Sequence, residues 1–492
     1  MGLLMHLTCL PGPHGSGDLG QGAHRFIDFC AEAGVSWWQM LPVNPPGDPP
    51  GNAPYTSPSA LAGNPFFVAL GELGLLSGEE LRPPQDVPDN RVDYPAMRHF
   101  REQALRTAYD RFIHASDDEK KPFHAFCDAQ RDWLEDYALF TAIKQVFAGK
   151  PWYEWDPPLR DRDPAALAEA RQAHAREIDF WRFVQYQFDQ QWQALRRHAA
   201  EKGVALIGDI PIFVAHDSAD VWAYPHLFRL NAVGRPEFVS GYPPDAAAPA
   251  GQKWGHPLYD WDAHRREGFK WWTARFASAF RRFDAVRIDH FLGFTRLWAI
   301  PASSPTAEKG TWWPTPGGQI LAAVRDALGE HPIIAEDLGR VTRHDAALRK
   351  RFGLPGMRIY LFGFDANQPQ AMYHRPHCYT HDSVAYTGTH DNPTLMEWLR
   401  EVRPRGSARM ARDYAGARGK QTHWAIIRAV MASPANTAIF PVQDVLGLGA
   451  EARMNRPGTR DGNWTWRISA DALTGEIAAR LRAMACLFGR LR

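Results

Sequence analysis

Short apolar runs that alternate with helix-like segments are the feature that most limits the folds open to this chain. Between the first two runs, Ala23, Phe26, Ile27 and Cys30 fall on one helical face, and Gly34 ends that segment. A strand, a helix and a second strand at this spacing indicate parallel pairing. Eight such runs predict an α/β fold, the (β/α)8 TIM barrel, with helical and loop insertions. They lie at residues 2–7, 35–41, 204–214, 285–288, 333–335, 357–362, 384–387 and 438–441.

The spacing of the runs also predicts where the barrel is interrupted. The 492 residues are long for a plain barrel and suit one that carries insertions. We expect a single catalytic barrel over residues 1–492. A largely helical insertion subdomain is expected at 42–203, after the second strand, and a loop insertion at the barrel mouth is expected at 215–260.

Charge and cysteine usage exclude several classes of partner. The formal net charge is +1, so there is no electrostatic case for nucleic acid or an anionic membrane. No apolar run is long enough to span a bilayer, and the first residues lack the basic region of a signal peptide. The five cysteines form no CxxC pair, which indicates free thiols in a reducing compartment. We therefore expect a cytoplasmic protein.

Three acids stand where predicted strands end. Asp289 follows the strand at 285–288, Glu336 follows the strand at 333–335, and Asp391 comes shortly after the strand at 384–387. The carboxyl ends of barrel strands converge on one mouth, so these acids should meet there. Asp289 is followed by His290 and Asp391 is preceded by His390, which makes coincidence a poor explanation for the cluster.

Arg287 should lie beside Asp289, because residues two apart on a strand share one face. A structural ion pair at a strand end would explain these two residues alone. Clustered carboxylates suggest either a metal site with oxygen ligands or glycosyl transfer, in which one carboxylate attacks and a second protonates the leaving oxygen. Glycosyl transfer needs two acids of different pKa. We expect crowding to raise the pKa of one acid and Arg287 to lower the pKa of Asp289.

Four motifs identify a family resemblance. The chain resembles the amylomaltases, which are 4-α-glucanotransferases of the α-amylase clan and are called disproportionating enzymes in plants. The resemblance covers essentially the whole chain. Its motifs are RIDHF at 287–291, AEDLG at 335–339, TGTHDN at 387–392 and GQKWGHPLY at 251–259.

The resemblance implies roles for the three acids. Asp289 would be the nucleophile that forms a β-glucosyl-enzyme, and Arg287 would orient it. Glu336 would be the general acid for cleavage and then the base that activates the acceptor. Asp391 would hold the 2- and 3-hydroxyls of the donor sugar and favour distortion of its ring.

The resemblance also implies a set of substrate-binding residues. Tyr55 would stack on the donor glucose, and Trp254 would line the acceptor side. The remaining residues would bind sugar hydroxyls, and they are Asp209, His290, His390 and Asn463. As alternatives, Tyr55 and Trp254 could be loop anchors and Asp209 could be a helix cap.

The implied activity is transfer of α-1,4-glucan segments from a donor maltooligosaccharide or glucan to the 4-hydroxyl of an acceptor glucan or glucose, with retention. Substrates would be maltooligosaccharides and glycogen or starch-type glucans, with no cofactor and no calcium. A retaining α-1,4-glucan hydrolase with the same acids is the nearest alternative, and a catalytically silent glucan-binding protein is a further one. Ala246 and Ala247 stand where many members carry aromatics, so we expect more hydrolysis here than in such relatives.

One other cluster could indicate a metal. His374, His377, Cys378 and His381 lie close together before the strand at 384–387. Their spacing fits no standard zinc site, and most such runs are polar loop residues. We therefore expect a structural loop here.

Overall fold

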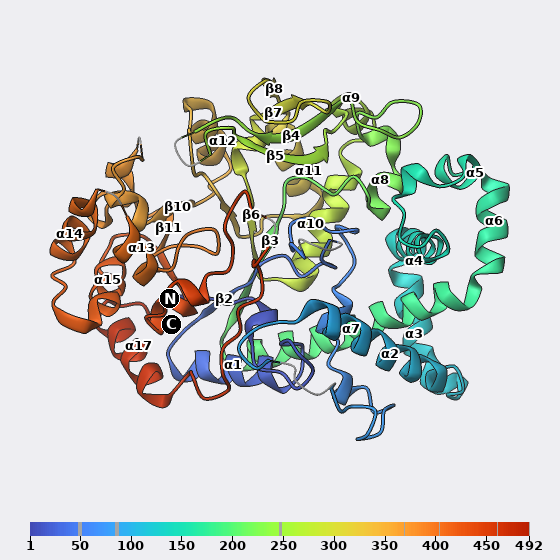
Figure 1. Ribbon diagram of the computed structural model, residues 1–492, viewed down its shortest axis with the longest axis horizontal. Coiled ribbons are helices and arrows are strands. Elements are labelled where there is room, and N and C mark those ends of the chain that lie inside the picture. Colours follow the sequence, from blue (N-terminus) through green and yellow to red (C-terminus); the bar gives the residue numbers. More distant parts are fainter. Residues whose placement is uncertain are drawn as a thin grey trace.

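A closed barrel of eight parallel strands forms the centre of the protein (Figure 1). The computed structural model describes residues 1–47, 52–83, 88–245, 248–368, 370–402, 404–459 and 461–491. Around the barrel the strands follow chain order, and β12 pairs with β1 to close it. The barrel strands are β1 (Gly2–Leu4), β2 (Trp37–Gln39), β3 (Ala205–Ile210), β6 (Ala285–Ile288), β9 (Ile333–Ala335), β10 (Gly356–Ile359), β11 (Ser383–Tyr386) and β12 (Thr437–Pro441).

The prediction of a TIM barrel is confirmed, and each of the eight predicted runs overlaps a barrel strand. These strands read as continuous apolar runs because helices cover their outer faces and the barrel interior is filled. The third strand is shorter than predicted. It ends at Ile210 because the next residue, Pro211, has no N–H to donate to a neighbouring strand.

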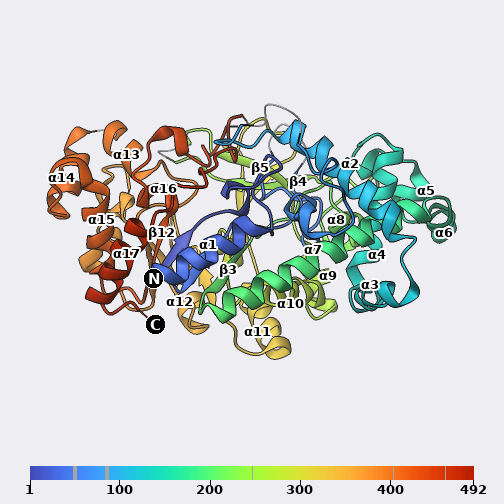
Figure 2. The same cartoon turned by 90° about the horizontal axis from the view of Figure 1, so that it is seen from below.

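Helices surround the barrel, as the views in Figures 1 and 2 show. The crossover from β10 to β11 instead consists of short 3-10 helices, at Leu361–Phe364, Ala371–His374 and Pro376–Cys378. α-Helices lie in the other crossovers, and they are α1 (Gln21–Glu32), α7 (Ala175–Glu201), α10 (Lys270–Arg282), α11 (Gly317–Leu328), α12 (Arg343–Arg351), α13 (Leu395–Glu401), α14 (Arg405–Tyr414) and α15 (Thr422–Met431). Two more, α16 (Val442–Val445) and α17 (Gly475–Leu487), follow the last barrel strand.

The segment between β2 and β3 is largely helical and extends to one side of the barrel (Figure 1). Its last helix, α7, also belongs to the layer around the barrel. The Trp192 indole of α7 donates to the carbonyl of Arg282, 3.0 Å away, and its ring meets Phe283 edge-on. The other helices of this segment are α2 (Tyr94–Phe112), α3 (Asp117–Ala129), α4 (Arg131–Val146), α5 (Pro157–Arg160) and α6 (Pro164–Ala173).

A second sheet lies at the upper edge of the molecule in Figure 1. Its antiparallel strands follow the order β5-β4-β7-β8. They are β4 (Phe238–Tyr242), β5 (Gln252–Pro257), β7 (Arg296–Pro301) and β8 (Thr311–Pro314). Residues 215–260 therefore form more than a loop, since they contain α8 (Ala219–Ala223), β4 and β5. Ala246 and Ala247, which lie between the two strands, are outside the described residues.

Two further findings concern the chain as a whole. Within the described ranges, no helix combines the length and the apolar composition needed to cross a membrane. All five cysteines lie in the described part, and each is a free thiol.

A buried ion pair joins the helical segment to the first crossover of the barrel. The Arg101 side chain of α2 is fully buried, and its guanidinium donates to Asp18 Oδ2 at 2.9 Å and to the carbonyl of Val68 at 2.9 Å. Removing one partner of such a pair leaves an uncompensated charge away from water.

We predict that Arg101→Met lowers the free energy of unfolding by about 3–5 kcal/mol, because Asp18 stays buried without its partner. Arg101→Met combined with Asp18→Leu should recover part of that loss. Arg176→Met removes the exposed pair with Asp110 and should cost at most about 1 kcal/mol. Urea unfolding followed by fluorescence measures all three. Equal losses in the buried and exposed variants would contradict the prediction.

Candidate active site

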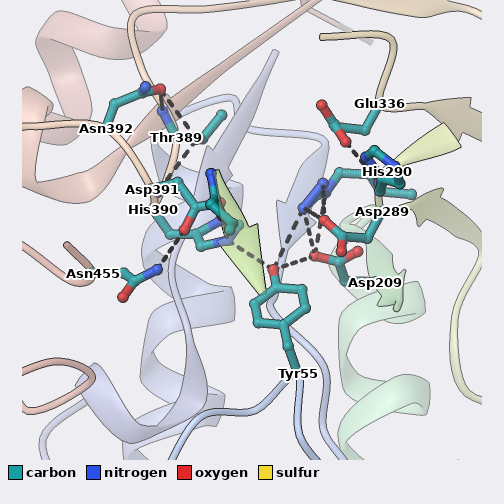
Figure 3. Close-up of polar contacts among 12 residues, drawn as sticks. Tyr55, Asp209, Asp289, His290, Glu336, Thr389, His390, Asp391, Asn392 and Asn455 are labelled. Carbon is teal, nitrogen blue, oxygen red and sulfur yellow. Dashed lines mark hydrogen bonds and ion pairs between the residues drawn. The ribbon is translucent and has the colours of Figure 1, made fainter. Parts of the chain in front are cut away.

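The three acids predicted from the sequence meet at the carboxyl ends of the barrel strands (Figure 3). Asp289 follows β6, and its backbone N–H donates to the carbonyl of Ile210 at 3.0 Å. Glu336 follows β9, and its backbone N–H donates to the carbonyl of Ile288 at 3.1 Å. The hydrogen bonding of the barrel thus continues to these two residues. Because β6 and β9 are neighbours, the barrel fixes Asp289 beside Glu336.

Arg287 joins two of the strands through their carboxylates. It pairs in register with Asp209 of β3, and its guanidinium lies 3.2 Å from Asp209 Oδ2. The same guanidinium donates two hydrogen bonds to Asp289 Oδ1, at 2.8 and 3.1 Å. The side chains of Asp209 and Arg287 are 0% and 4% exposed, whereas that of Asp289 is 27% exposed. Of the two acids that Arg287 binds, the predicted nucleophile is therefore the one that faces solvent.

Tyr55 connects the Arg287 cluster to the opposite side of the mouth. Its hydroxyl donates to Asp209 Oδ2 at 2.7 Å and lies 2.8 Å from His390 Nε2, as the dashed lines in Figure 3 show. Its ring stacks on the His390 imidazole, with centroids 5.3 Å apart and planes at 13°. The structure thus brings Tyr55, Asp209 and His390 together with Arg287 and Asp289.

Glu336 is held by backbone N–H groups. The amide of His290 donates to Glu336 Oε2 at 2.6 Å, and the amide of Leu338 donates to Oε1 at 3.2 Å. His290 adopts a left-handed backbone conformation, with φ of 49°. That conformation is uncommon for a residue with a side chain, and such strain is typical of functional sites.

Asp391 lies on the loop after β11 and makes two side-chain contacts. His390 Nε2 is 3.3 Å from Asp391 Oδ2, and Asn455 Nδ2 donates to Asp391 Oδ1 at 2.6 Å. Asn455 did not emerge from the sequence, because it lies on an irregular segment 64 residues further along the chain. Only the fold brings it to the acid.

Buried Asp444 of α16 fastens both ends of the loop that carries Asp391. Its Oδ2 accepts from the Thr387 hydroxyl at 2.5 Å, and its Oδ1 accepts from the amide of Leu395 at 2.7 Å. One side chain therefore holds the end of β11 and the start of α13. The loop between them, which carries Asp391 at the mouth, is therefore anchored at both ends.

Aromatic side chains of the second sheet pack on His290. The ring of Trp254 on β5 meets the His290 imidazole edge-on at 4.9 Å, and the ring of Tyr242 on β4 does so at 5.8 Å. The Tyr242 hydroxyl also accepts from the amide of Arg340 at 3.3 Å. Sequence reasoning missed Tyr242, because no motif marks it. The loop predicted around Trp254 is largely the β4–β5 hairpin, so this residue stands on a strand.

Asn463 organises its own segment in this structure. Its amide nitrogen donates to the carbonyl of Thr459 at 3.0 Å, and its oxygen accepts from the amide of Arg456 at 2.9 Å. The oxygen and the nitrogen of the Asn463 amide, which was predicted to bind sugar, thus both have hydrogen-bond partners within the chain. Trp464 follows, and its ring lies 6.0 Å from the rings of both Tyr55 and His390.

Asp289 and Glu336, the two acids on neighbouring strand ends, differ in pKa. Burial raises the pKa of Asp289 to about 7 against the attraction of Arg287. Arg287 does act to lower this pKa, as predicted, but burial outweighs the guanidinium, so the net shift is upward and not downward as expected. Burial raises the pKa of Glu336 well above its usual value, and the charge of Asp289 raises it further. Asp289 accepts two hydrogen bonds from a cation, whereas Glu336 accepts its hydrogen bonds from neutral amides, so Glu336 is the acid of the two that keeps its proton near neutral pH.

Asp391 is shifted in the opposite direction. Burial disfavours its charged form, but His390 and Asn455 outweigh burial and lower the pKa of Asp391. Burial also lowers the pKa of His290 to about 4, so this imidazole is neutral near pH 7. Near neutral pH the mouth therefore combines a protonated acid, a carboxylate that titrates in this range and a carboxylate that is ionised.

The described residues include no group of three or more histidine, cysteine, aspartate or glutamate side chains placed to hold a metal ion. In the cluster before β11, His374 is buried and its Nδ1 accepts from the amide of Ile359 at 3.1 Å. This histidine thus binds the backbone of β10.

Comparisons with known proteins agree with this geometry. A family model described as 4-alpha-glucanotransferase matches residues 5–473. The chain is 46% identical over 492 residues to the 4-alpha-glucanotransferase of Thermus thermophilus, covering 98% of this chain and 97% of that protein. The chain belongs to the 4-alpha-glucanotransferase family. It is also 42% identical over 499 residues to the Synechocystis sp. 4-alpha-glucanotransferase, covering 99% of this chain and 97% of that protein.

A solved member of the 4-alpha-glucanotransferase family has nearly the same fold. The amylomaltase from Streptococcus agalactiae, solved in complex with acarbose, aligns with a TM-score of 0.95 and 35% identity, over 100% of this chain and 99% of that chain. The resemblance found in the sequence motifs is therefore confirmed.

We predict a bell-shaped dependence of kcat/KM on pH. Activity should rise as Asp289 ionises through about pH 7 and fall at higher pH as Glu336 loses its proton. Arg287→Gln removes the charge that opposes burial, so its acidic limb should move to higher pH by about 1–3 units. Disproportionation rates measured from pH 4 to 10, with circular dichroism to verify folding, check this shift.

Arg343→Gln removes an exposed charge at the start of α12 and serves as the control. Its pH profile should match that of the wild type. An unshifted acidic limb in folded Arg287→Gln would show that Arg287 does not act on Asp289.

Proposed function

We propose that the protein transfers α-1,4-glucan segments from a donor maltooligosaccharide or glucan to the 4-hydroxyl of an acceptor glucan or glucose, by a retaining double displacement. The observation that carries this proposal is the pair of acids on neighbouring strand ends, Asp289 paired with Arg287 and Glu336 held by backbone amides. Retaining transfer requires one ionised and one protonated carboxyl group at the same bond.

In the first step, Asp289 attacks the anomeric carbon while Glu336 gives its proton to the departing glycosidic oxygen. This yields a β-glucosyl ester on Asp289 and a shortened glucan. In the second step, ionised Glu336 takes the proton of the acceptor 4-hydroxyl, whose oxygen attacks the anomeric carbon and releases Asp289. The new α-1,4 bond replaces the broken one, and both acids return to their starting state.

The surrounding residues bind the sugars in this proposal. Asp391, held by His390 and Asn455, receives the 2- and 3-hydroxyls of the donor glucose and favours ring distortion. Tyr55 stacks on the donor glucose, and its hydroxyl is held by Asp209. Arg287 orients Asp289, and Asp209 binds Arg287 from the neighbouring strand.

On the acceptor side, Trp254 and His290 provide an aromatic wall next to Glu336. Asn463 contributes through the segment that it holds rather than through a free amide. Maltooligosaccharides and glycogen or starch-type glucans are the proposed substrates, with glucose as an acceptor. We also propose residues 1–492 as one catalytic unit, with insertions at 42–203 and 215–260, working in the cytoplasm. The five free thiols support that location.

We predict that the purified protein converts maltotriose into glucose and a ladder of longer oligosaccharides, with little net gain in reducing ends. Asp289→Asn should retain the fold and lose at least about 10³-fold in rate, because the ester can no longer form. Product chromatography combined with a reducing-end assay measures both outcomes. Steady growth of reducing ends without longer products would instead identify the retaining hydrolase.

We predict that Glu336→Gln loses activity mainly toward donors with poor leaving groups. A glucan oxygen needs a proton to depart, whereas a fluoride or nitrophenolate leaving group does not. Formation of the glucosyl-enzyme should therefore survive with α-maltosyl fluoride and fall by about 10²–10⁴-fold with maltotriose. Equal losses on the two donors in single-turnover experiments would argue against the acid role.

A further inference from the structure

A groove outside the barrel mouth has the composition of a sugar-binding surface. It lies between β8 and the helix α9 (Trp261–Arg266), and its volume is about 310 Å³. That volume is at the lower end of the range of ligand pockets, which is about 300–1,000 Å³. Buried Leu258, Tyr259 and Leu297 form its floor. We call it the α9 groove.

Two partly exposed tryptophans form the walls of the α9 groove. They are Trp261, at the start of α9, and Trp313, on β8. Within the described structure, the Trp261 indole N–H has no hydrogen-bond partner, so it can donate to a ligand. Flat rings suit the apolar faces of sugars, and an indole N–H suits a hydroxyl.

The rim of the α9 groove is close to neutral. Arg265 donates to Asp262 Oδ1 at 2.6 Å and to Gln319 Oε1 at 3.1 Å, so its charge is compensated. Exposed Arg229 lies over the Trp313 ring at 5.1 Å, and within the described part of the chain its guanidinium donates no hydrogen bond. An anion site would gather several uncompensated cations. The single guanidinium of Arg229, which has no carboxylate partner among the described residues, lies beside two rings and suits a neutral polyol.

One strand connects the α9 groove to the candidate active site. β5 carries Trp254, whose ring contacts His290, and Leu258 of the groove floor follows directly after β5. A second aromatic link runs through Phe213, whose ring lies 6.1 Å from the rings of both Trp254 and Tyr259. The groove is thus held rigidly with respect to the mouth, while its lining residues differ from those around the acids.

We propose that the α9 groove binds a segment of a long α-1,4-glucan and so tethers polymeric substrate next to the mouth. The proposal rests on the proposed α-glucan substrate. A tethered chain reaches the acids at an effective concentration set by the tether, which raises turnover on polymers without changing the chemistry. Short donors such as maltotriose cannot occupy both places and should not benefit.

The test compares two donors in three groove variants. Trp261→Ala and Trp313→Ala each remove one wall, and Arg229→Ala removes an exposed rim donor. With amylose as donor and glucose as acceptor, kcat/KM should fall by roughly tenfold in the tryptophan variants. Disproportionation of maltotriose should stay within about twofold of the wild type.

Trp312→Ala is the matched control, because residue 312 is the neighbour of Trp313 on β8 and points to the other face. Its ring is 38% exposed and packs on Trp298, so its removal deletes an exposed tryptophan outside the groove. Both activities should be unchanged in this variant.

Binding supplies a readout that does not depend on turnover. Catalytically inactive Asp289→Asn should be retarded by amylose in affinity electrophoresis, and adding Trp261→Ala or Arg229→Ala should weaken that retardation. Unchanged amylose kinetics and retardation in the folded groove variants would overturn the proposal, as would equal losses on amylose and maltotriose. A wild type that does not disproportionate maltotriose would refute the proposed function instead, whatever the groove binds.

Discussion

The arrangement of the candidate site depends on the buried guanidinium of Arg287. It binds Asp209 on the neighbouring strand and Asp289 directly after its own strand, and the Tyr55 hydroxyl lies against the same group. Breaking such a cluster strands a charge away from water, at a cost of about 3–5 kcal/mol. The contacts of Arg287 therefore fix the pairing of β3 with β6 and the position of the predicted nucleophile together. A shift of register between these strands would separate Asp209 from Arg287.

Three carboxyl groups share one mouth, and their surroundings give them different protonation. Asp289 accepts hydrogen bonds from a cation, Glu336 accepts them from neutral amides, and Asp391 accepts them from His390 and Asn455. Burial acts on all three, so the partners decide the order of their pKa values. The groups that hydrogen-bond to the three acids thus decide which acid is protonated, and so which role each acid can take.

Local patterns were enough to predict the barrel, because buried parallel strands form apolar runs and their ends carry the acids. Contacts between distant segments were not predictable in the same way. Asn455 and Tyr242 reach the mouth from an irregular segment and from a second sheet, and neither lies in a motif. Burial is likewise a property of the whole fold and cannot be read from a motif. Because burial raises the pKa of Asp289 more than Arg287 lowers it, the net shift is upward, whereas the sequence predicted a downward shift.

Closure of the barrel by β1 and β12 has a consequence for biosynthesis. The partner of Gly2 is Ile439, so the first strand of the barrel needs the last one. At about 5–20 residues per second, β12 leaves the ribosome roughly 20–90 s after β1. During that interval the nascent sheet has open edges, which are prone to pair with other chains. Newly made protein therefore depends on protection of those edges until β12 has been made.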